Sequence, residues 1–260
     1  MKIGIAQIDC EPCNVDRNIQ KIRDYSERAK QQECDLVIFP EMSDTGYDPQ
    51  TVRSCASSWS GGPCDELSSI AAELELHLVC GLSELVGDDL FNAVAVFGPD
   101  GKPVTSYRKS HLMADEPICE HRLFAPGNSL TLFNVGDLKF GLMICYDLRF
   151  PEMARALTLR GAEVILLSSA WPLSRLQHWK ALVNCRAIEN QLYMVCANRV
   201  GSDGRMNFCG ASCLIDPWGE SVAPLLELEE DLIVGTITKE VIQKTRDFMH
   251  VFNHRRADLY

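Results

Sequence analysis

One stretch constrains the fold more than any other: a short apolar run that ends at a cysteine and leads into a helix. Residues 140–144 (FGLMI) do not alternate between apolar and polar side chains, which is typical of a strand buried on both faces. Cys145 follows the run, and Pro151 stands where it can begin a helix. The pattern predicts an α/β sheet with Cys145 at the edge where open sheets bind ligands.

A second bare apolar run, residues 36–39, is stopped by Pro40 and followed directly by Glu41. Other apolar runs alternate with segments of helical periodicity along the chain, which predicts a mixed sheet layered with helices. Glu41 is therefore expected at the same kind of sheet edge as Cys145.

A hairpin is predicted where residues 91–97 and 102–107 flank the turn sequence GPDG. Lys109 leaves the end of this hairpin. The following residues, 110–128, show no periodicity, so this long loop is expected to be either functional or mobile.

The three side chains at these ends can act together in nucleophilic catalysis. A thiolate that attacks a carbonyl or nitrile carbon needs a proton acceptor, stabilisation of the oxyanion and a base that later activates water. We expect Lys109 to favour the thiolate and to hold the oxyanion with the backbone N–H of Tyr146, while Glu41 transfers protons. The alternatives are a buried core thiol for Cys145 and a surface carboxylate for Glu41.

Composition narrows the class of protein. A chain of 260 residues with 46% hydrophobic residues can form one large domain, and a net charge of -11 disfavours nucleic acid or an anionic membrane as partner. No apolar run has the length of a signal or membrane segment, so a cytoplasmic protein is expected. Twelve cysteines without a repeating spacing are expected to be reduced and mostly buried.

The last segment, residues 238–260, is too short for a core of its own but carries several apolar side chains. We expect this C-terminal tail to pack on the rest of the chain or on a neighbouring subunit.

Three segments resemble the signature segments of the nitrilase superfamily of carbon–nitrogen hydrolases: 39–41 (FPE), 107–112 (YRKSHL) and 141–152 (GLMICYDLRFPE). The likeness extends over nearly the whole chain. It implies a four-layer α-β-β-α sandwich with two mixed sheets, formed as a single domain by residues 1–260, that pairs into homodimers or larger assemblies. It also implies a catalytic triad of Glu41, Lys109 and Cys145; no metal and no cofactor are expected.

The same resemblance implies further roles. Glu120 matches the second glutamate of the family, which positions substrate or supports the lysine; the alternative is an ordinary loop carboxylate. Segments 145–150, 170–175 and 198–201 are similar to the omega-amidase branch. That branch implies hydrolysis of the terminal amide of a small carboxylate-bearing compound, such as 2-oxoglutaramate or deaminated glutathione, with release of ammonia. An N-carbamoyl-amine hydrolase, or another amide hydrolase of the superfamily, is the alternative.

A substrate carboxylate would be recognised by a buried arginine. Arg149, Arg175 and Arg199 are candidates, although Arg149 could equally be a structural partner of Glu152 or Asp147. Aromatic side chains near the strand ends could form the walls of the pocket, with plain packing as the alternative. The residues expected to bind substrate are Tyr47, Tyr146, Arg149 and Trp171.

Three other functions are consistent with parts of the sequence. A cysteine hydrolase could use His111 or His178 as its base. A zinc protein could use the pairs Cys10-x-x-Cys13 and Cys209-x-x-x-Cys213. A binding protein could have kept the fold and lost turnover.

Overall fold

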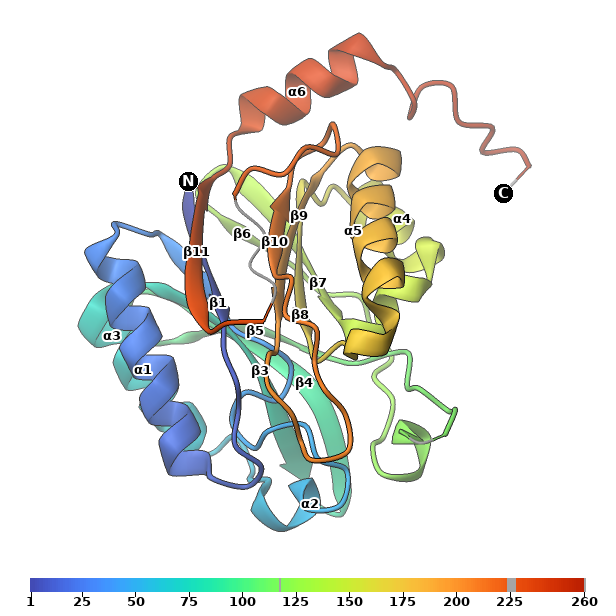
Figure 1. Cartoon of the computed structure of the whole chain (residues 1–260). Coiled ribbons are helices and arrows are strands. Elements are labelled where there is room, and N and C mark those ends of the chain that lie inside the picture. Colours follow the sequence, from blue (N-terminus) through green and yellow to red (C-terminus); the bar gives the residue numbers. More distant parts are fainter. Residues whose placement is uncertain (117, 224–227, 260) are drawn as a thin grey trace.

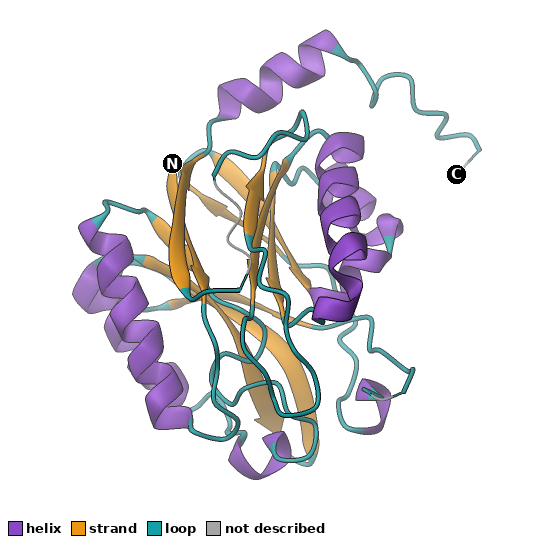
Figure 2. Cartoon of the chain, viewed as in Figure 1, coloured by secondary structure: helices purple, strands orange, loops and turns teal. Residues whose placement is uncertain are grey.

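Two β-sheets pack face to face, and helices cover both outer surfaces (Figure 1; Figure 2). The computed structural model describes residues 1–116, 118–223 and 228–259. The arrangement is the four-layer α-β-β-α sandwich with two mixed sheets that the family resemblance implied.

The first sheet has six strands in the order β11-β1-β2-β3-β4-β5. β1, β2 and β3 are parallel, whereas the predicted hairpin β4–β5 and the strand β11 add antiparallel neighbours. The strands are β1 (Lys2–Gln7), β2 (Leu36–Ile38), β3 (His77–Val86), β4 (Asp89–Phe97), β5 (Pro103–Arg108) and β11 (Asp231–Thr236).

The second sheet has five strands in the order β10-β9-β8-β7-β6. β7, β8 and β9 are parallel, and β6 and β10 are antiparallel at the two edges. The strands are β6 (Leu132–Val135), β7 (Leu138–Ile144), β8 (Val164–Ser169), β9 (Tyr193–Asn198) and β10 (Cys213–Ile215).

Helices α1 (Val15–Gln31) and α3 (Pro63–Leu74) cover the first sheet, and α4 (Pro151–Leu159) and α5 (Leu176–Asn190) cover the second (Figure 1). The sequence explains this packing for α1, because its apolar side chains recur at helical spacing and are buried. Shorter helical segments are α2 (Val52–Cys55), η1 (Glu120–Arg122), η2 (Cys145–Arg149) and η3 (Leu173–Arg175). None of the helices in the described ranges has both the length and the apolarity needed to cross a bilayer.

Hydrogen bonds between the two sheets fix their relative position. The Ser168 hydroxyl of β8 donates to the Phe39 carbonyl beyond β2 at 2.8 Å, and the Ser212 N–H donates to the Gln7 side chain of β1 at 2.8 Å. The carboxyl ends of β2 and β8 therefore meet, which matters because Glu41 follows β2.

The C-terminal tail begins with α6 (Lys239–Phe248), which lies beyond the end of the sandwich (Figure 1). Gln191 donates to the Met249 carbonyl at 2.8 Å, and the Arg155 guanidinium lies 5.1 Å from the centre of the Phe252 ring. Phe248, however, is 73% exposed. The tail thus contacts its own chain through these residues, while its packing on a neighbouring subunit and the oligomeric state stay predictions.

One pair of cysteines contradicts the expectation of reduced thiols. Cys13 and Cys55 form a disulfide across a sequence separation of 42 residues. The other ten cysteines are free, and eight of them are buried. Because Cys13 is bonded to Cys55, it is not available for the four-thiolate zinc set, and the described residues contain no group of three or more His, Cys, Asp or Glu side chains that could hold a metal.

Candidate active site

The turn after β2 carries Glu41 into the interior. Gly81 makes this possible, because a Cβ atom at that position would lie only 2.3 Å from the Pro40 carbonyl oxygen. Glu41 is fully buried, so the alternative of a surface carboxylate is wrong.

Backbone contacts fix Lys109 at the end of β5. Its N–H donates to the Asn92 carbonyl at 2.8 Å, and its own carbonyl accepts the Gly127 N–H at 2.8 Å. A Cβ atom on Gly127 would lie 2.0 Å from the Arg108 carbonyl oxygen, so the loop approaches this closely only because Gly127 has no side chain. The Lys109 side chain is 1% exposed.

The Lys109 ammonium lies between two buried carboxylates. Its Nζ donates to Glu41 Oε1 at 2.8 Å and to Glu120 Oε1 at 2.7 Å. Burial lowers the pKa of an ammonium, but the negative charges of Glu120 and Glu41 outweigh burial and raise the pKa of Lys109 well above its ordinary value. An ammonium has three hydrogens, so one remains for another acceptor.

The two carboxylates accept donors in the same pattern, with Oε1 more heavily used than Oε2. Glu120 accepts Lys109 and the Tyr47 hydroxyl on Oε1 and the Met113 N–H on Oε2. Glu41 accepts Lys109 and Asn92 on Oε1 and the Ala170 N–H on Oε2. Each carboxylate oxygen has two lone pairs, so the Oε2 atoms of Glu41 and Glu120 each keep one free.

Cys145 lies where β7 turns into η2. Its φ of +40° is a left-handed conformation that residues with a side chain rarely adopt, and such strain is typical of functional sites. Burial and then the negative charge of Glu41 raise the pKa of the Cys145 thiol, while Lys109 and Ser169 oppose that effect. Burial and Glu41 thus oppose the thiolate that the sequence led us to expect here, whereas Lys109 and Ser169 favour it.

One carboxylate ties the Cys145 turn to the segment that carries Lys109. Asp147 accepts the Ile144 N–H at 2.9 Å, the Tyr107 hydroxyl at 2.8 Å and the His111 ring nitrogen at 2.7 Å. The His111 ring also stacks on Phe150, with 3.8 Å between ring centroids. His111 is thus engaged away from the thiol, which argues against its predicted alternative role as base.

A narrow pocket of about 20 Å³ opens next to Cys145, Lys109 and Glu120. It offers room for about one water molecule. All four predicted substrate-binding residues line it, although their roles stay predictions. The lining consists of Tyr47, Lys109, Met113, Ile118, Glu120, Cys145, Tyr146, Arg149, Ala170, Trp171, Pro172 and Arg175.

Two of the three candidate arginines reach this pocket. The Arg149 guanidinium lies 4.6 Å from the centre of the Trp171 ring and 3.4 Å from the His178 ring nitrogen, so it is not the predicted partner of Glu152 or Asp147. His178 is correspondingly occupied with Arg149.

Arg199, by contrast, is buried elsewhere. It donates to Asp9 and to the Cys10 carbonyl, and is therefore a structural residue of the sheet edge.

Sequence reasoning missed Asn92. Its side-chain amide donates to Glu41 at 2.7 Å and more weakly to Glu120 at 3.4 Å, which holds both carboxylates in place. The signal was present: Asn92 is the one polar side chain within the apolar run 90–97.

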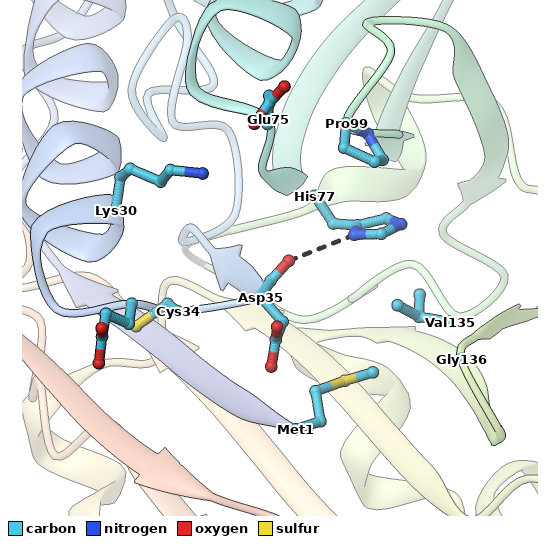
Figure 3. Close-up of a pocket in the computed structure, with 10 residues that line it drawn as sticks. Met1, Lys30, Cys34, Asp35, Glu75, His77, Pro99, Val135 and Gly136 are labelled. Atoms are coloured by element: carbon cyan, nitrogen blue, oxygen red, sulfur yellow. Dashed lines mark hydrogen bonds between the residues drawn. The ribbon is translucent and has the colours of Figure 1, made fainter.

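A second, larger hollow of about 620 Å³ lies at the opposite ends of the strands, beside the amino ends of β1, β2 and β3 (Figure 3). In Figure 3 the side chains of Lys30, Glu75 and His77 surround it. Its thiol, Cys34, has a pKa raised to about 11 by burial. This hollow is separate from the Cys145 site.

The comparison with known families agrees with this geometry. A model of the carbon-nitrogen hydrolase family matches residues 2–247. The chain belongs to this family. As a carbon–nitrogen hydrolase, it carries the cysteine, lysine and glutamates in the cluster described above.

Individual proteins of known activity or structure are also similar to this chain. The carbon–nitrogen hydrolase is 32% identical to the 2-oxoglutaramate amidase of Bacillus subtilis, covering 99% of this chain and 98% of that protein. It is 30% identical to the human omega-amidase, covering 100% of this chain and 96% of that protein. Among solved structures, the nitrilase-superfamily amidase of Nesterenkonia AN1 superimposes with a TM-score of 0.89 at 27% identity, covering 100% of this chain and 95% of that one.

Proposed function

We propose that this protein hydrolyses the terminal amide of a small carboxylate-bearing compound and releases ammonia through a thioester on Cys145. The observation that carries the proposal is the Lys109 ammonium, held by two buried carboxylates beside a strained cysteine in one pocket. Glu41, Lys109, Cys145 and Glu120 then have catalytic roles.

In the first half-reaction, the Cys145 sulfur attacks the amide carbonyl carbon while its proton passes to Glu41. Because the pKa of the thiol is raised, attack and proton transfer occur together and no free thiolate accumulates. The third hydrogen of the Lys109 ammonium and the N–H of Tyr146, in the first turn of η2, stabilise the oxyanion. Glu41 then protonates the amide nitrogen, the C–N bond breaks, and ammonia leaves.

In the second half-reaction, water attacks the thioester carbon and gives its proton to Glu41. The C–S bond breaks, the carboxylic acid leaves, and the sulfur recovers the proton from Glu41. Glu41 can serve in both directions because Oε2 has a free lone pair and because its charge acts on the Cys145 thiol more strongly than that of Glu120 does. Glu120 holds Lys109 in place.

Two arginines at the mouth support a substrate that carries a carboxylate. Arg175 donates to the Met113 sulfur at 3.5 Å and, like Arg149, pairs with no carboxylate within the described ranges. Burial and then the positive charge of Arg175 lower the pKa of Arg149. Two neighbouring cations without an anion favour an anionic ligand.

The relatives support the same chemistry. A glutamate-to-glutamine mutant of the Nesterenkonia amidase holds the acetamide moiety of fluoroacetamide covalently at its active site cysteine. The names of the Bacillus subtilis and human relatives, 2-oxoglutaramate amidase and omega-amidase, support a terminal amide opposite a carboxylate.

The test is ammonia release from pairs of amides of equal length, one with a distal carboxylate and one with a distal methyl group. A ureide and a nitrile complete the panel. We expect the carboxylate-bearing amide to have the higher kcat/KM by roughly 10- to 100-fold, the value of a charge-assisted hydrogen bond. Arg149→Met should remove that preference without lowering the rate with the neutral amide.

Arg28→Met is a matched control. Arg28 also lies 4.6 Å from an aromatic ring centre, that of Tyr25, but on α1, so its replacement should leave the preference unchanged. A higher rate with the ureide would favour the N-carbamoyl-amine alternative, and equal rates for the paired amides would contradict carboxylate recognition.

A further inference from the structure

Ser169 lies beside Cys145 although it is distant in sequence. In the parallel pairing of β7 and β8, Ile144 is opposite Ser168, so the next position on each strand brings Cys145 and Ser169 together at the shared carboxyl edge. Ser169 is fully buried.

The backbone carbonyl of Ser169 has hydrogen-bond partners, but its side-chain hydroxyl has none in the described part of the chain. Its carbonyl accepts the N–H groups of Glu41 at 3.5 Å and Arg199 at 2.9 Å. Its hydroxyl oxygen, in the described part of the chain, has no hydrogen-bond partner. A buried hydroxyl without a partner lowers stability, so its presence calls for a reason.

The adjacent serine gives the contrast. Ser168 is also buried, but its hydroxyl donates to the Phe39 carbonyl at 2.8 Å. Successive side chains of a strand point to opposite faces of the sheet, so the Ser169 hydroxyl does not make the contact that Ser168 makes.

We infer that the Ser169 hydroxyl donates a hydrogen bond to the Cys145 sulfur as negative charge forms on it. Ser169 is then a further catalytic residue of the amide hydrolysis proposed above, and the inference rests on that proposed function. When the thiol proton passes to Glu41, the hydroxyl hydrogen turns toward the sulfur. When the sulfur bonds to the acyl carbon, its charge moves to the carbonyl oxygen and the hydroxyl is released; it is needed again when the C–S bond breaks.

The charges around the sulfur explain why such a donor is needed. Burial and Glu41 disfavour the thiolate, and the positive charge of Lys109 is already shared between Glu41 and Glu120. A neutral donor stabilises the sulfur without drawing Lys109 away from its carboxylates. The pKa of the Cys145 thiol is consistent with this, because the nearby Ser169 hydroxyl lowers it against the effect of burial, although the two groups make no hydrogen bond in the resting site.

The experiment measures the rate at which iodoacetamide alkylates Cys145 in the full-length protein at neutral pH. The extent of alkylation is read by peptide mass spectrometry. Alkylation forms the S–C bond, expels iodide and requires the thiolate, so it reports stabilisation of the sulfur charge independently of amide turnover. Cys185, which is free and exposed, serves as the reference thiol in the same sample.

Ser169→Ala should slow the alkylation of Cys145 relative to Cys185 by about tenfold or more, the value of a hydrogen bond to a charged group, and should lower kcat/KM for the amide similarly. Ser169→Thr, which keeps the hydroxyl, should restore both to within about threefold. Ser168→Ala is the matched control: it loses a made hydrogen bond and should lower stability, yet leave the Cys145 alkylation rate unchanged.

The inference would be overturned if Cys145 were alkylated in Ser169→Ala at the wild-type rate. It would also be overturned if Cys145 were alkylated as slowly in Ser169→Thr as in Ser169→Ala. The proposed function fails separately: wild-type protein that releases no ammonia from any amide refutes the hydrolase proposal, whatever the two serine variants show in the alkylation assay.

Discussion

Replacing Lys109 with methionine keeps most of the side-chain length but removes the charge that two buried carboxylates share. Glu41 Oε1 and Glu120 Oε1 are both hydrogen-bonded to Lys109 Nζ, at 2.8 and 2.7 Å, so these two oxygens lie at most about 5.5 Å apart. At an effective dielectric constant of about 20, two negative charges at that distance repel by about 3 kcal/mol. This equals a rise of roughly two pH units in the pKa of one carboxyl group.

The sign of the pH dependence follows from this rise. In Lys109→Met, one carboxyl group titrates at higher pH in the folded than in the unfolded state, so its contribution to stability is complete at low pH and is lost as pH rises through the folded pKa. Of this contribution of about 3 kcal/mol to the free energy of unfolding, about 2 kcal/mol is lost between pH 5 and pH 8. In the wild type both carboxylates are compensated by Lys109, so this loss is absent.

The assay is urea unfolding of both proteins at pH 5 and pH 8. The destabilisation of Lys109→Met should be about 2 kcal/mol larger at pH 8 than at pH 5. Lys109→Met/Glu120→Gln should reduce that difference, because the repulsion between two carboxylates is gone and only burial still disfavours the charge of the remaining one. Lys102→Met is the control, because the Lys102 side chain is 80% exposed beside Asp100. A difference below about 0.5 kcal/mol between the two pH values would refute the charge arrangement described here.

Two further changes test the scaffold around the site. Gly81→Ala should reduce kcat far more than it reduces substrate binding, since its Cβ would displace the Pro40 carbonyl and with it Glu41; an unchanged kcat in a folded variant would contradict this. Cys55→Ser should lower the free energy of unfolding by up to about 4 kcal/mol, the chain-entropy value for a loop of 42 residues, and reduction of the wild-type protein should have the same effect in denaturant titrations. Equal stability of oxidised and reduced protein would show that the Cys13–Cys55 bond does not constrain the unfolded chain.

The sequence predicted those parts of the site that lie at the ends of apolar runs. Glu41 and Cys145 follow such runs directly, and Lys109 follows a hairpin, so local pattern alone indicated an edge position for each. Glu120 has no such signal, because it lies in a loop without periodicity, and only the family resemblance drew attention to it. The structure brings it within 2.7 Å of Lys109.

Other features depend on spatial proximity that no local pattern records. Ser169 matters through the register of two parallel strands, and Asn92 through contacts across the sheet to two loops. The Cys13–Cys55 pair could not be deduced because spacing does not define disulfide connectivity. The effect of burial on the pKa of Cys145, which opposes that of the neighbouring ammonium, is a property of the folded chain and could not be read from the sequence.

The most direct test of the central claim is the intact mass of Glu41→Gln after incubation with a monoamide of a small dicarboxylic acid. Glu41 serves both half-reactions, so Glu41→Gln slows both, but deacylation more, because water is a weaker nucleophile than the thiol and depends more on a base. On long incubation the protein should therefore gain the mass of the acyl group, and peptide mapping should locate it on Cys145. Cys145→Ala should gain nothing. Absence of any adduct on Glu41→Gln, or an adduct on another cysteine, would contradict the proposal that the thiol, ammonium and carboxylate of this pocket act together on an amide.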